Sequence, residues 1–134
     1  MKRALISIAF LCSFCGLSFG HTHRIIRHPF DASYCSALAT ANVFLHAWQS
    51  EDHETGIVML SDSARQHTSP EQLQEFFSPG PDAAYEIARG RRIKSGSYIF
   101  PVVLFSSTTH SHRLATAIII TRGGKNEWAV AKLP

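Results

Sequence analysis

Histidines are the residues of this sequence whose spacing is best suited to binding a metal ion. Eight of the 134 residues are histidine, and His110 and His112 alternate along the chain. Alternate residues of an extended segment share a face, so two such imidazoles can approach the same ion. A structural zinc site needs about four ligands. The candidates for a third ligand are His46, His53 and His67. The expected setting of the pair is a solvated turn, and the metal site is the alternative.

A second candidate metal site, at His21 and His23, depends on where the mature chain begins. Lys2 and Arg3 precede a run of residues, 4–20, that carries no charge and ends in Ser18-Phe19-Gly20. A basic start, an apolar core and small residues at the end are the pattern of a cleavable signal peptide. The run is shorter than the ~20 apolar residues that span a bilayer. We therefore expect cleavage after Gly20, no transmembrane segment in the mature chain, and a secreted or periplasmic location.

Cleavage after Gly20 makes His21 the first residue and His23 the third. The free amine, two backbone amides and the imidazole of His23 then form a square-planar set of nitrogens, which copper(II) and nickel(II) favour. His21 adds an imidazole that can join the amine in a competing chelate. Copper(II) is therefore the metal expected at this terminus, and no other cofactor is predicted from the sequence. The alternative is a loose end whose histidines bind nothing in the cell.

Cysteine usage excludes an intramolecular disulfide in the mature chain. Cys12 and Cys15 leave with the signal peptide, and both follow a bulky residue, which argues against a lipidation signal. Cys35 remains as the single cysteine. It is expected to be a buried free thiol that behaves as a small hydrophobic residue. A nucleophile at a helix start and an intermolecular bridge are the alternatives.

The charge of the chain does not indicate nucleic-acid binding. The sequence has 13 basic and 10 acidic residues, and two of the basic ones, Lys2 and Arg3, leave with the signal peptide. The densest basic run, residues 89–94, has no interleaved aromatic residues to stack on bases. A solvated strand face is the better interpretation of this run.

The first half of the mature chain has helical spacing. After an extended lead-in over residues 21–32, Asp31 or Ser33 can cap a helix over residues 33–49. Its apolar residues recur on one face, at Leu38, Ala41, Phe44, Leu45 and Trp48. A second helix is expected over residues 55–66. A third is expected over residues 69–77, where Ser69, Pro70 and Gln72 fit a capping box with proline at the first helical position.

The second half has strand spacing. Strands are predicted over residues 85–93, 98–106, 113–121 and 127–133, with turns between them. The segment 98–106 is apolar on both faces, which predicts a central strand covered on both sides, and Pro101 predicts a bulge or bend in it. The fold class is therefore α+β, with three N-terminal helices packed on a curved antiparallel sheet of about four strands.

The chain from Ser36 to Leu133 resembles the nuclear-transport-factor-two-like superfamily, the cone fold shared with ketosteroid isomerase and SnoaL-type cyclases. The resemblance lies in Phe44-Leu45-His46-Ala47-Trp48 at the end of the first helix, Val58-Met59-Leu60 in the second, and Glu127-Trp128-Ala129-Val130 in the last strand. It is closest to small exported members of the group. It implies a single domain over residues 33–134, in which a bent sheet folds around a helix to make a conical pocket.

The resemblance also implies that a catalytic member would carry a general base in the pocket, as a carboxylate or in a His/Asp or Tyr/Asp pair. No acid can be assigned to the pocket from the sequence. In the strands, Glu86 points away from the face of Tyr85, and Glu127 follows a turn. The other acids considered, Asp31, Asp52, Asp62 and Asp82, lie in caps or loops. No catalytic residue is therefore predicted.

Aromatic residues are the candidates for lining such a pocket. They are Trp48, Tyr85, Tyr98 and Trp128, for which a place in the apolar core is the alternative. Three functions remain open. The first is a binding module that holds a small apolar ligand or pairs with a second copy through its sheet. The second is an isomerase, dehydratase or cyclase that uses the same pocket. The third is an accessory domain without pocket chemistry.

Overall fold

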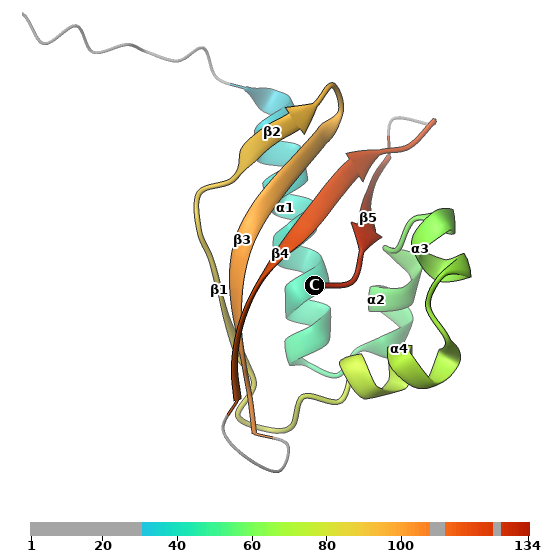
Figure 1. The fold of residues 1–134 in the computed structure, drawn as a ribbon, viewed down its shortest axis with the longest axis vertical. Helices are drawn as coiled ribbons and strands as arrows, with labels where there is room; N and C mark the ends of the chain where they lie inside the picture. Colours follow the sequence, from blue (N-terminus) through green and yellow to red (C-terminus); the bar gives the residue numbers. More distant parts are fainter. Residues whose placement is uncertain (1–30, 108–111, 125–126) are drawn as a thin grey trace, which may run out of the picture.

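The structure is a computed structural model, and it describes residues 31–107, 112–124 and 127–134. The predicted signal peptide, the His21 and His23 site and His110 lie outside the described residues, as does the side chain of His112. Within the described ranges four helices precede five strands (Figure 1). They are α1 (Ala32–Gln49), α2 (His53–Val58), α3 (Asp62–Gln66), α4 (Pro70–Phe76), β1 (Ala84–Ile87), β2 (Arg91–Lys94), β3 (Ser97–Ser106), β4 (His112–Arg122) and β5 (Trp128–Lys132). None of these helices combines the length and hydrophobicity needed to cross a membrane. The predicted α+β class is confirmed.

Helix α1 forms where the sequence predicts it. The Asp31 carboxylate caps it by accepting hydrogen bonds from the backbone N–H groups of Ser33 and Tyr34, at 3.1 and 3.2 Å. Its buried face consists of Ala37, Ala41, Phe44, Leu45, Ala47 and Trp48. Leu38 is only partly buried, at the margin of the core. This apolar face lies against the sheet, as expected.

The prediction of one helix over residues 55–66 is wrong, because the chain forms α2 and α3 with a break between them. In the break, Leu60 forms an isolated parallel bridge with Val130 of β5. The N–H of Ser61 donates to the carbonyl of Val130 at 2.9 Å, and the Ser61 hydroxyl then caps α3 by accepting from the N–H of Ala64. Backbone bonding to the last strand thus replaces the hydrogen bonds that a continuous helix would make.

The sheet is antiparallel, and β3 lies at its centre. On one side β3 pairs with β4 along its whole length, from Ser97 opposite Thr121 to Ser106 opposite His112. On its other side β3 pairs with both β1 and β2, and β5 pairs with β4. The single strand predicted over residues 85–93 is therefore two short strands that follow one edge of β3.

Pro101 explains the break between β1 and β2. The N–H of Ala88 donates to the carbonyl oxygen of Pro101 at 2.9 Å, so the backbone of Pro101 faces this edge. Proline has no N–H to return the bond. Ile87 pairs with Val102 and Arg91 pairs with Ile99, so the edge advances by four residues while β3 advances by three. The pairing of β3 with β4 runs through Pro101 without a register shift, so the irregularity near Pro101 lies on the opposite edge, where one extra residue separates β1 from β2.

The two faces of β3 differ in what covers them. Tyr98, Phe100, Val102 and Leu104 are buried in the same core cluster as the apolar face of α1. The alternate side chains, from Ile99 to Phe105, are partly buried or exposed, and no helix of the described residues lies over them (Figure 1). The prediction of a strand covered on both sides is therefore wrong for the described chain, because none of the described helices covers this second face, called here the outer face.

A polar cluster joins the start of α1 to the hairpin of β2 and β3. The Asp31 carboxylate accepts a hydrogen bond from the Tyr98 hydroxyl at 2.8 Å and one from the Arg92 guanidinium at 3.0 Å. Arg92 also donates to the Tyr98 hydroxyl. The hydrogen bond from Tyr98 is the main cause that lowers the pKa of Asp31, and the backbone N–H of Tyr34 and the Arg92 guanidinium add to it.

We expect this cluster to make stability depend on pH in the acid range. The pKa of Asp31 is lower in the folded chain than its usual 3.8. The ionised carboxylate therefore contributes fully to stability above pH 3.8, and this contribution is lost as the pH falls through the lowered pKa of the folded chain. The free energy of unfolding, measured between about pH 5 and about pH 2, should therefore fall less steeply in Asp31→Asn than in the wild type. Asp82→Asn, at an exposed loop position, is the control. Equal slopes for wild type and Asp31→Asn would contradict the cluster.

Candidate ligand-binding cavity

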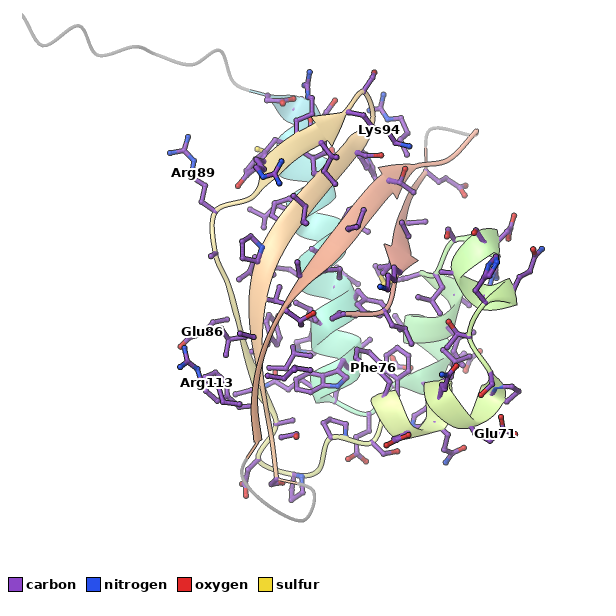
Figure 2. The ribbon with its side chains drawn as sticks, in the orientation of Figure 1. Glu71, Phe76, Glu86, Arg89, Lys94 and Arg113 are labelled. Carbon is purple, nitrogen blue, oxygen red and sulfur yellow. The ribbon has the colours of Figure 1, made fainter. Side chains whose placement is uncertain are left out.

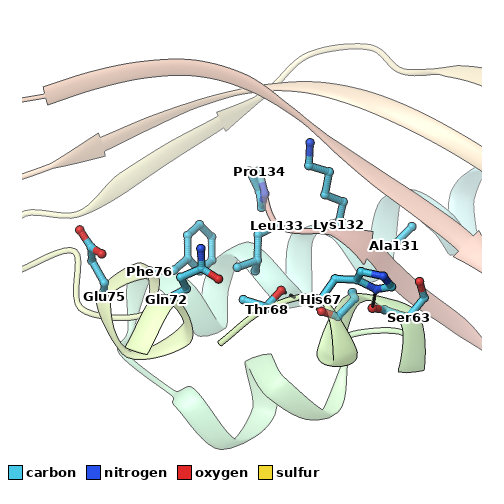
Figure 3. Close-up of a pocket in the computed structure, with 11 residues that line it drawn as sticks. Ser63, His67, Thr68, Gln72, Glu75, Phe76, Ala131, Lys132, Leu133 and Pro134 are labelled. Carbon is cyan, nitrogen blue, oxygen red and sulfur yellow. Dashed lines mark hydrogen bonds between the residues drawn. The ribbon is translucent and has the colours of Figure 1, made fainter. Parts of the chain in front are cut away.

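An open cavity of about 730 Å³ lies between α3, α4 and the end of the chain (Figure 3). Its lining residues are Ser63, Ala64, His67, Thr68, Gln72, Glu75, Phe76, Ala131, Lys132, Leu133 and Pro134. The volume is within the range of small-molecule sites. Apolar side chains, above all Phe76 and Leu133, form much of its wall.

Helix periodicity explains which residues face the cavity. In α4, Gln72, Glu75 and Phe76 are three and four residues apart, and this spacing places side chains on one face of a helix. The capping box predicted for this helix is present. The Ser69 hydroxyl accepts from the backbone N–H of Gln72, and the side-chain Oε1 of Gln72 accepts from the backbone N–H of Ser69. The same residue that closes the cap thus belongs to the cavity wall.

Helix α3 and the chain after β5 make the other walls. Ser63 and His67, four residues apart, share one face, and the backbone carbonyl of Ser63 accepts a hydrogen bond from Nδ1 of His67 at 2.7 Å. A carbonyl oxygen can only accept, so Nδ1 carries a proton and Nε2 is left for other partners. Leu133 and Pro134 follow β5 into the space between the sheet and α4 (Figure 3).

Two charged side chains line the cavity without a charged partner. The two ion pairs among the described residues join Arg65 to Asp62 and Arg92 to Asp31, so neither involves Lys132 or Glu75. Lys132 extends from β5, and Glu75 lies on α4 at the other end of the cavity (Figure 3). The cavity therefore has a cationic end and an anionic end, separated by apolar side chains.

A smaller cavity of about 330 Å³ lies beside the end of α1. Its lining residues are Asn42, Val43, His46, Ala47, Asp52, Thr55 and Tyr85. The Tyr85 hydroxyl donates to the carbonyl of Asn42 at 3.3 Å, and burial raises the pKa of Tyr85. Asp52 caps α2, and its hydrogen bonds with Thr55 lower its pKa. The Tyr85 hydroxyl and the Asp52 carboxylate thus already form hydrogen bonds within the protein.

The four aromatic residues predicted to bind a ligand do not meet in one cavity. Tyr98 and Trp48 are 1% and 3% exposed and belong to the core. Trp128 is partly buried, with its ring centroid 5.8 Å from that of Tyr98. Tyr85 lines the smaller cavity. Their role in binding stays a prediction, and the wall of the larger cavity consists of other residues.

The larger cavity contains an acid, although none could be assigned to a pocket from the sequence. Glu86 and Glu127 are exposed, as expected. However, Glu75 and His67 line the larger cavity, because its walls come from α3, α4 and the chain end rather than from strands alone. The spacing of residues 72, 75 and 76 on one helix face was the sequence signal that could have found Glu75. The bond from Tyr98 to Asp31 joins residues 67 positions apart, which no local pattern reveals.

The remaining candidates lie apart from one another. His46 is exposed at the smaller cavity, and the ring of His53 lies against Phe77, with centroids 5.8 Å apart. No group of three or more His, Cys, Asp or Glu residues within the described ranges is placed to hold a metal ion. Cys35 is exposed, so the expectation of a buried thiol is wrong: it lies on the outer side of α1, next to the exposed Ser36.

The arrangement of α1 against a bent antiparallel sheet, with short helices at one end, matches solved structures. A ketosteroid isomerase-like protein from Erwinia carotovora atroseptica superimposes with a TM-score of 0.54 at 16% sequence identity, over 77% of this chain and 94% of that one. The chain shares the fold of this protein. The cone fold inferred from the sequence resemblance is therefore confirmed.

Other comparisons are weaker or negative. A structure from Campylobacter jejuni, named as an NTF2-like transpeptidase, superimposes with a TM-score of 0.47 at 14% identity, over 72% of this chain and 95% of that one. No protein-family model and no curated protein matches the sequence. The cone fold of this chain is thus established by tertiary structure, while its chemistry has to be argued from its own residues.

Proposed function

We propose that this protein is an exported binding domain that holds a small, mainly apolar molecule in the larger cavity. The observation that carries the proposal is an open cavity of about 730 Å³ whose wall includes Phe76, Ala64 and Leu133. Cavities of this size with apolar walls and a few polar groups are the usual form of small-molecule sites. Export is supported by the uncharged run over residues 4–20 behind Lys2 and Arg3.

The alternative is an enzyme of the isomerase, dehydratase or cyclase type that uses the same cavity. His67 and Glu75 are the residues there that could transfer a proton. They lie at different ends of the cavity in Figure 3, so one does not orient the other as in a paired acid and base. This separation favours binding over turnover.

Pairing with a second copy through the sheet is the second part of the proposal. The outer face is apolar along β3 and β4: Ile99, Pro101, Val103, Phe105, Ala115, Ala117 and Ile119 share it, because directly opposed residues of neighbouring strands lie on one face. Glu86 and Arg113 border it and point away from the helices (Figure 2). A border with both signs of charge suits a copy of the same face better than a strongly charged partner.

Native mass spectrometry of the protein purified from its source cell tests all three parts. We expect a dimer, a subunit mass that matches a chain beginning at His21, and added mass from a bound small molecule. Ser63→Trp should fill the cavity and remove that added mass, while Gln66→Trp on the same helix should keep it. Val103→Lys should give a monomer, since it places charge on the outer face.

Each readout can fail separately. A wild-type monomer contradicts pairing, and a subunit that retains residues 1–20 contradicts export with cleavage. A wild type without added mass, or a Ser63→Trp variant that keeps it, contradicts binding in this cavity.

A further inference from the structure

Two of the polar groups that line the larger cavity can donate hydrogen bonds to a ligand: the Lys132 ammonium and the side-chain amide of Gln72. Lys132 has three N–H donors and no acceptor. The side-chain oxygen of Gln72 already accepts from the backbone N–H of Ser69, so the side-chain amide offers the cavity its N–H donors. The Thr68 hydroxyl donates its one hydrogen to the carbonyl of Ala64 at 2.8 Å, so toward a ligand it can only accept. The donors of Lys132 and Gln72 are suited to a ligand that brings acceptor atoms.

The charges give that ligand a direction. The Lys132 ammonium forms no ion pair with a described residue, and Figure 3 shows it extending from β5 beside Leu133. Glu75 lies at the opposite end, on α4 beside Phe76 (Figure 3). An anionic group is attracted at the Lys132 end and repelled at the Glu75 end, while the apolar side chains between them can hold a hydrocarbon body.

We propose that the ligand is an apolar molecule with one carboxylate, and that Lys132 binds the carboxylate while Phe76 and Leu133 contact the apolar part. This proposal rests on the proposed binding function, which it makes specific. Lys132 is exposed, so the charged end of the ligand lies at the mouth of the cavity, where it keeps part of its hydration. The apolar end enters the cavity, where burial supplies most of the affinity.

The test measures displacement of a neutral fluorescent probe, N-phenyl-1-naphthylamine, from the full chain by decanoate and by 1-decanol. These competitors have the same hydrocarbon chain and differ in the anionic group. We expect decanoate to bind more tightly than decanol. Lys132→Met should weaken decanoate about fivefold, as for a solvent-exposed charge pair, and leave decanol unchanged.

Two variants serve as controls. Lys94→Met makes the same change of charge in the β2–β3 hairpin, at the far end of the molecule from α4 (Figure 2), and should leave both competitors unchanged. Lys132→Arg keeps the positive charge and should keep the preference for decanoate. If the probe binds but decanoate and decanol displace it with equal affinity, the proposal of a carboxylate ligand is wrong, while the binding function stands. The same conclusion follows if Lys132→Met and Lys94→Met change the affinity for decanoate equally. Failure of the probe to bind contradicts the binding function itself.

Discussion

Replacing Trp48 with alanine is expected to lower the free energy of unfolding by about 3–5 kcal/mol, as for other large buried aromatic residues. Trp48 is 3% exposed and lies in the last full turn of α1, on the face that contacts the sheet. Its ring also contacts α4, with its centroid 6.3 Å from that of Phe76. Truncation would leave a cavity at the point where α1, the sheet and α4 meet. Urea or thermal unfolding measures the loss.

Val43→Ala is the matched control for this experiment. Val43 lies on the same helix and is 52% exposed, so its side chain contributes little to the core. Alanine is also the better helix former. We expect a change within about 0.5 kcal/mol. If Trp48→Ala were as harmless as Val43→Ala, the packing of α1 on the sheet would be wrong.

Gly56→Ala is expected to destabilise the protein by about 1–3 kcal/mol, although alanine normally strengthens a helix. A Cβ atom at Gly56 would lie 2.1 Å from Cζ and 2.2 Å from Cε1 of Phe77. The Phe77 ring is fully buried and is held by Phe44 and Phe76, with centroid distances of 5.6 and 5.1 Å. The ring therefore has little room to move, and α2 would be pushed away from the core.

The glycine effect can be separated from a general cost of substitution. Gly124→Ala is the control, because a Cβ atom there would meet nothing within 4 Å, and we expect no loss of stability. In a double-mutant cycle, Phe77→Leu should cost less in the Gly56→Ala background than alone, because the smaller side chain relieves the clash. Additive effects of the two substitutions would show that α2 does not lie on Phe77.

The sequence alone determined the parts of the fold that depend on neighbouring residues. The apolar spacing from Ala41 to Trp48 predicted α1, and Ser69 and Gln72 predicted the capping box of α4, because both signals act within a few residues. The apolar run over 98–106 located β3, although it did not show which of its two faces is covered. The resemblance then supplied the cone fold, which the structural comparison confirmed.

Only the tertiary structure decided what depends on residues distant in the chain. Leu60 breaks a predicted helix because it bridges to Val130, 70 positions away. Pro101 cannot donate a hydrogen bond to the edge strand beside it, and that edge strand is divided into β1 and β2, while β3, which contains Pro101, is continuous. The outer face of β3 is apolar yet uncovered by the described helices, which the pattern of one strand could not distinguish from a strand buried on both sides.

The larger cavity shows this limit most clearly. Its walls come from α3, α4 and the chain end, and nothing in any one of these segments indicates that the other two face it. Local periodicity can assign Glu75 to a helix face and Lys132 to a strand. It cannot place them at opposite ends of one apolar cavity, because that distance is set by how the short helices pack against the curved sheet.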